Sequence, residues 1–179
     1  SITDDLVMIF CTAGKIYHSN IPSSEMEEKF GITSEDVHLL TPEVIQDCEL
    51  SLQSLFSVYK PLDIRPILIE IEDAKYYNVM LSIYKSENMY QNILYLWIQL
   101  QAKQNSRQVD HGDYENPFLE SGSEINVKNI FQSVPNMVHN ALKNTPPNQI
   151  SNVVNLIAKN FSTFVTNDPK GIARIVTCD

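Results

Sequence analysis

Residues 73–101 read DAKYYNVMLSIYKSENMYQNILYLWIQLQ, and their pattern is the strongest structural signal in the chain. Apolar side chains recur there at intervals of three or four residues, first from Tyr76 to Tyr84 and again from Ile93 to Leu100. Side chains at this spacing share one face of a helix, so the pattern predicts two amphipathic helices. The polar residues 86–88 predict a tight turn between them, and we therefore expect an antiparallel helical hairpin.

A single hairpin leaves part of its apolar stripe uncovered, so it needs similar helix pairs before and after it in the chain. Helix starts recur on both sides. Thr41-Pro42 and Asp168-Pro169 each place a capping side chain before a proline that suits the first helical position. No segment has a convincing strand period. We therefore predict an all-α fold, an α-solenoid of stacked antiparallel helix pairs with about eight or nine helices.

Residues 1–179 are expected to form a single solenoid segment, which a flexible polar insertion at 104–124 interrupts. Those residues have no helical period, and unstructured loops of that length are uncommon inside compact domains. Buried positions are also predicted near both ends of the chain. They are Leu6, Val7, Ile9, Phe10 and Ala13 in the first helix, and Val153, Val154, Ile157, Phe161 and Phe164 in one helix that opens at Asn148 or Ser151.

The composition is that of a globular protein, with 43% hydrophobic and 20% charged residues. The net charge of -9 argues against a nucleic-acid partner, because binding to phosphates depends on clustered Lys and Arg. No basic run or long apolar segment predicts attraction to, or insertion into, a membrane. Cys11, Cys48 and Cys178 lie far apart and are best explained as buried thiols in a reducing compartment rather than as a disulfide framework or a zinc site.

No catalytic, cofactor-binding or metal-binding motif is recognisable, and with five glycines the chain has little backbone to cradle a phosphate. We therefore expect no enzyme activity, no cofactor and no metal. An all-helical enzyme is the alternative. It would use Cys11 with His18, seven residues later and able to share a helix face, or the acidic cluster at 110–113 that contains His111.

Four aromatic residues are candidates for contacts with another protein, because aromatic side chains are enriched at the centres of interfaces. Tyr77 and Tyr95 fall outside the main apolar stripe of the hairpin. Tyr114 and Phe118 belong to the only apolar patch of the polar insertion.

Residues 72–79, Glu-Asp-Ala-Lys-Tyr-Tyr-Asn-Val, resemble the acid-x-Ala-x-aromatic-Tyr-x-Val element of the helical repeats shared by clathrin heavy chain and the large vacuolar protein sorting tethers. Residues 89–94 resemble the turn where the next helix of those repeats begins, although Asn88 stands in place of their usual glycine. Residues 161–173 are similar to the helix, Asp-Pro, helix join of the CORVET-specific subunits of the class C vacuolar sorting assemblies.

This resemblance implies the middle of a longer tether subunit, an α-solenoid between a β-propeller and a RING-like zinc domain. The expected function is a non-enzymatic scaffold in an endosomal membrane-tethering complex, acting in vesicle fusion and vacuolar or lysosomal protein sorting. Implied partners are other class C subunits, of CORVET or of its relative HOPS, and a Rab-family GTPase bound through other parts of the protein. The implied location is cytoplasmic and peripheral on the endosomal membrane. A free-standing helical interaction or inhibitory module is the alternative.

Overall fold

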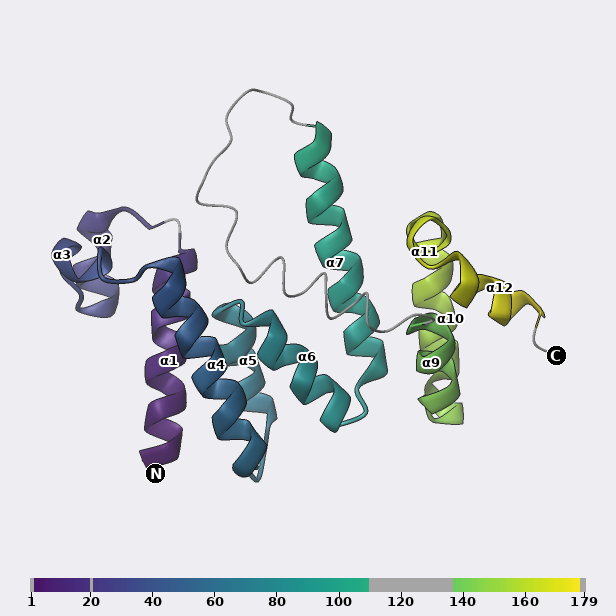
Figure 1. Ribbon diagram of the computed structural model, residues 1–179, viewed down its shortest axis with the longest axis horizontal. Coiled ribbons are helices and arrows are strands. Elements are labelled where there is room, and N and C mark those ends of the chain that lie inside the picture. The colour runs from purple at the N-terminus through teal and green to yellow at the C-terminus, as the bar shows by residue number, and fades with distance from the viewer. Residues whose placement is uncertain (1, 20, 110–136, 178–179) are drawn as a thin grey trace. The chain divides into compact units, whose positions relative to one another are not determined.

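The computed structural model describes residues 2–19, 21–109 and 137–177. Within these ranges the chain forms eleven α-helices and one 3-10 turn, with no strand (Figure 1). The all-α prediction is therefore confirmed, but the predicted number of eight or nine helices is too low. One added helix arises because the segment predicted to be a single helix through Phe164 is broken at Asn160.

The described residues divide into two compact units, and the boundary between Ser82 and Ile83 falls inside α6. The helices up to this boundary are α1 (Ile2–His18), α2 (Ser23–Phe30), α3 (Ser34–Val37), α4 (Pro42–Val58), α5 (Arg65–Asp73) and α6 (Tyr77–Ser86). Those after it are α7 (Tyr90–Val109), α9 (Met137–Asn144), α10 (Ile150–Lys159), α11 (Phe161–Asn167) and α12 (Pro169–Thr177), with the 3-10 turn at Pro147–Gln149. A solenoid running through both units stays a prediction.

The first unit is built around α1, which packs against both α4 and α5 (Figure 1). The buried Tyr76 hydroxyl donates a hydrogen bond of 2.6 Å to the carbonyl oxygen of Phe10 in α1. Gly14 permits this approach, because a Cβ atom there would lie 2.8 Å from the Tyr76 ring. Lys15 adds an ion pair with Glu70 of α5. Tyr76 thus belongs to the core of this unit, as its place in the predicted hairpin stripe indicates.

Two residues with left-handed backbone conformation lie at the two ends of α6, the first helix of the predicted hairpin. Lys75 has φ 58° between α5 and α6, and Asn88 has φ 56° between α6 and α7. Asparagine tolerates this conformation better than most residues, which explains how Asn88 can occupy a turn position where glycine is usual. The two predicted helices and the turn between them are therefore confirmed.

A buried carboxylate that the sequence did not reveal connects α4 to α6. Glu49 of α4 is only 4% exposed, and its Oε1 accepts hydrogen bonds from the backbone N–H groups of Asn78 at 2.8 Å and Val79 at 3.4 Å. These are among the first N–H groups of α6, which have no acceptor within their own helix. Glu49 therefore caps a helix that begins 28 residues later in the chain.

In the second unit, α7 packs against α9 and α10. The indole of Trp97 is buried and stacks on the ring of Phe164, with ring centroids 5.0 Å apart and an angle of 28° between the planes. The α7 helix continues to Val109, so the first part of the predicted insertion at 104–124 is helical. The remainder of that insertion lies outside the described residues.

Asp168 holds the last helices of the second unit together. Its Oδ1 accepts a hydrogen bond from the N–H of Gly171 at 3.2 Å, and its Oδ2 accepts one from the N–H of Val138 at 3.4 Å. One carboxylate thus caps the N-termini of both α12 and α9. This confirms the Asp168-Pro169 helix start and explains the buried contact between these two helices.

Candidate interaction surface

The α1 helix carries apolar side chains on two faces, and only one of them is packed. Val7, Cys11 and Gly14 lie on the buried face that meets α4 and α5. Ile2 and Ile9 are 81% and 62% exposed, and Leu6 between them is also exposed. Spacings of four and three residues place these three side chains on one face of the helix. We call them the α1 outer stripe.

The sequence prediction for α1 was wrong at Leu6 and Ile9, which it placed in the core. The pattern of α1 is apolar on more than one side, so periodicity alone cannot decide which face meets α4 and α5. Tyr76 and Ala74 come within contact distance of Gly14, and a glycine gives no apolar signal. α1 therefore approaches the segment between α5 and α6 closely at a glycine, a position that hydrophobic periodicity does not mark.

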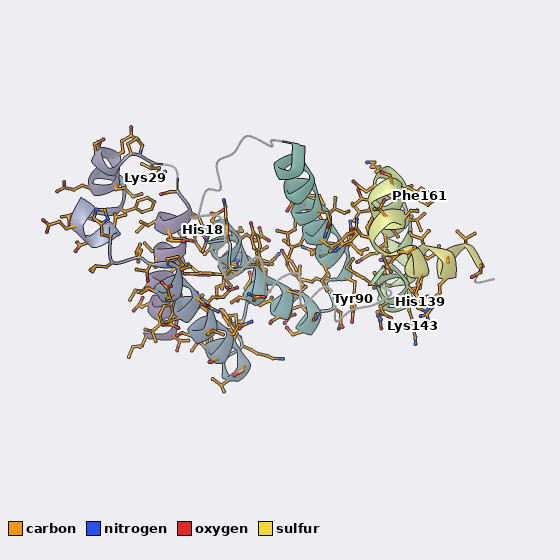
Figure 2. The ribbon with its side chains drawn as sticks, turned by 45° about the horizontal axis from the view of Figure 1, so that its top comes forward. His18, Lys29, Tyr90, His139, Lys143 and Phe161 are labelled. Atoms are coloured by element: carbon orange, nitrogen blue, oxygen red, sulfur yellow. The ribbon has the colours of Figure 1, made fainter. Side chains whose placement is uncertain are left out.

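The second unit exposes a separate group of apolar side chains on α10 and α11. Val154 and Phe161, which the sequence placed inward, are both exposed, and Phe161 is 53% accessible (Figure 2). The break at Asn160, with φ -121° and ψ 28°, ends the helical phase that would have aligned Phe161 with Val153. Phe164 is fully buried as predicted, so α11 turns a new face to the core.

The four predicted contact residues have different environments. Tyr95 is 55% exposed on α7, whereas Tyr77 is half-buried at the start of α6. Tyr114 and Phe118 lie outside the described residues. Of the two candidates that lie within the described residues, Tyr95 is therefore the exposed one.

The groups considered for catalysis are not assembled into a site in the part of the chain that the structure describes. Cys11 is fully buried, and burial raises the pKa of its thiol to about 11, which opposes formation of the nucleophilic thiolate. His18 ends α1 with its ring edge against Tyr17, 4.9 Å between centroids (Figure 2). The cluster at 110–113 lies outside the described residues.

Among residues 2–19, 21–109 and 137–177, no three His, Cys, Asp or Glu side chains are grouped so that they could hold a metal ion. None of the helices in those ranges combines the length and the apolar character that crossing a bilayer requires.

Comparisons with protein-family models, with curated protein sequences and with solved structures give no match to this chain. The assignment of a function therefore depends on the surfaces described above and on the sequence resemblance.

Proposed function

We propose that this chain is a non-enzymatic helical scaffold segment that binds other proteins. The α1 outer stripe is the observation that carries the proposal. A helix that is apolar on several sides is normally covered on several sides, and here Ile2, Leu6 and Ile9 remain open while the opposite face is packed. A helix from a neighbouring repeat or from a partner protein would bury this stripe in the way that stacked helical repeats cover one another.

More specifically, we propose that this scaffold is a segment of an α-solenoid in an endosomal tethering subunit of the class C type. The sequence element at 72–79 supports it, because its Ala74, Tyr76 and Val79 are all buried where α5 joins α6. The join at Asp168 and Pro169 supports it too, since that aspartate caps two helices. Both resembling elements thus lie at helix junctions, where a repeat protein needs fixed side chains. Other class C subunits are the proposed partners, with a Rab-family GTPase bound elsewhere in the protein.

The proposal is tested by measuring binding of the purified chain to purified class C subunits by calorimetry. The double variant Leu6→Ser with Ile9→Ser removes the α1 outer stripe but leaves the buried face intact. We expect it to lose binding. The matched control is Val58→Ser, which changes a more exposed apolar residue at the end of α4.

Circular dichroism must show the same helix content in all three proteins. No binding of the unaltered chain to any class C subunit would refute the tether assignment. Equal binding by the double variant would show that the stripe is not the contact surface.

A further inference from the structure

The charge of the chain is divided unevenly between its two units. Residues 2–82 contain fourteen acidic and five basic side chains, a net charge of -9. The second unit, residues 83–119 and 128–179, contains six acidic and eight basic side chains, a net charge of +2, and within its described residues 83–109 and 137–177 two are acidic and seven are basic. The acidic balance of the whole chain therefore hides a basic region, and an argument from net charge alone does not apply to the second unit.

Three cations of this region lie on adjoining helices. Lys159 ends α10, and Lys170 and Arg174 lie one turn apart on α12; all three are exposed. The α11 helix between them contacts both α10 and α12. No ion pair within the described residues involves these cations. The only acid in residues 137–177 is Asp168, whose carboxylate is committed to the caps of α9 and α12.

Exposed apolar side chains lie on α11, the helix between those that carry these cations. Phe161 and Val165 are exposed and four residues apart, so they share one face of α11. Figure 2 shows the Phe161 ring at the surface of this helix. We name the set of Lys159, Phe161, Val165, Lys170 and Arg174 the C-terminal basic surface.

We propose that the C-terminal basic surface binds the anionic lipids of a membrane surface. Cationic side chains next to exposed apolar ones match a bilayer interface, where the cations meet lipid phosphates and the apolar groups enter the boundary with the acyl chains. Two of the three cations are lysines, which are depleted from protein interfaces but whose long stems suit the headgroup region. Exposed Val165 adds aliphatic area that a nucleic-acid backbone would not use.

This inference goes beyond the proposed function, which requires only protein contacts. It assigns lipid binding to the second unit, because the acidic residues of the first unit are repelled by anionic lipids. The two surfaces use different residues, so one variant can remove lipid binding and another can remove protein binding.

The test is vesicle flotation with the full chain at low ionic strength. We expect binding to vesicles of phosphatidylcholine with phosphatidylserine, no binding to phosphatidylcholine alone, and release as salt is added, because salt screens exposed charges. The pair Lys159→Gln with Lys170→Gln should lower the partition coefficient about 25-fold, from roughly fivefold for each cation near the surface. Phe161→Ser should lower it further.

The matched control is Lys29→Gln with Lys60→Gln, which removes the same charge from exposed positions of the first unit. It should leave binding unchanged, as should the α1 variant Leu6→Ser with Ile9→Ser, even if that variant loses its protein partners. Equal losses in both lysine pairs would overturn the proposal. It would also fail if the chain did not bind the vesicles that contain phosphatidylserine, whether or not it bound polyglutamate, an acidic polypeptide.

Discussion

Replacing Glu49 tests how the first unit is held together. Its carboxylate comes from α4, is almost completely buried, and accepts the backbone N–H bonds of Asn78 and Val79 at the start of α6. Glu49→Ala removes the acceptor and leaves both N–H groups without a partner from α4. Glu49→Gln has nearly the same shape, keeps an oxygen that can accept these bonds, and removes the charge.

The expected cost of Glu49→Ala has two parts. Loss of a capping side chain costs about 1 kcal/mol, and a buried N–H left unsatisfied costs about 1–3 kcal/mol. We expect unfolding free energy to fall by about 2–4 kcal/mol in total. Glu49→Gln should lose much less.

The comparison between glutamate and glutamine should depend on pH. Burial raises the pKa of Glu49 above its ordinary value of 4.5, and the N–H bonds from Asn78 and Val79 oppose this shift only in part. Folding therefore favours the neutral carboxyl group. Its contribution to stability is fully present below the unfolded pKa and is lost as the pH rises through the folded pKa. Because glutamine does not titrate, Glu49→Gln should gain stability relative to the native chain as the pH increases.

Urea unfolding of the three proteins over a pH series measures both the cost of Glu49→Ala and the pH dependence of Glu49→Gln. Subtracting the free energy of unfolding of the native chain from that of Glu49→Gln removes the contribution of the other carboxyl groups, because both proteins contain them. Amide hydrogen exchange at Asn78 and Val79 reports on α6 directly and should accelerate in Glu49→Ala. The reasoning is refuted if Glu49→Ala costs less than about 0.5 kcal/mol, the ordinary range for surface changes. A constant difference between glutamine and glutamate from about pH 3, below the ordinary pKa, to about pH 8 would refute the charge argument.

Three further substitutions test the packing. Trp97→Ala should cost about 3–5 kcal/mol because its indole is buried against Phe164, whereas Tyr95→Ala, two residues earlier and exposed, should cost less than about 1 kcal/mol in the same urea titration. Asp168→Ala should cost about 1–2 kcal/mol and accelerate amide exchange at the starts of both α9 and α12; acceleration at only one would contradict the shared cap. Gly14→Ala should lower the free energy of unfolding, measured by thermal denaturation, by about 1–3 kcal/mol, because the added Cβ clashes with the Tyr76 ring even though alanine is the better helix former.

Helix starts were predictable from the sequence because their signals are local. The Thr41 hydroxyl accepts a bond of 3.3 Å from the N–H of Val44, and Asp168 caps the helix that it immediately precedes. A cap involves residues three apart, so no tertiary information is needed to recognise it. Asn88 is a similar case, since its left-handed backbone conformation belongs to the turn itself.

The surfaces were not predictable for the opposite reason. Apolar periodicity identifies a helix face that avoids water, but α1 has more than one, and the partner that selects between them comes from residues more than 50 positions away. Phe161 was misplaced because a single residue, Asn160, resets the helical phase. The burial of Glu49 depends on a helix N-terminus distant in the sequence. Each of these errors concerns which helices pack against each other, and the apolar periodicity of a single helix does not contain that information.

Glu49 and Asp168 make the same kind of contact in two regions of opposite charge. Each spends a carboxylate on the N–H groups of a helix that another part of the chain contributes. In residues 2–82 Glu49 is one acid of fourteen. In residues 137–177 Asp168 is the only acid, and the exposed Lys159, Lys170 and Arg174 are cations. Within residues 137–177 the C-terminal basic surface therefore has no nearby acid other than Asp168, whose carboxylate accepts hydrogen bonds at the starts of α9 and α12, and this excess of exposed cations is what the lipid-binding proposal requires.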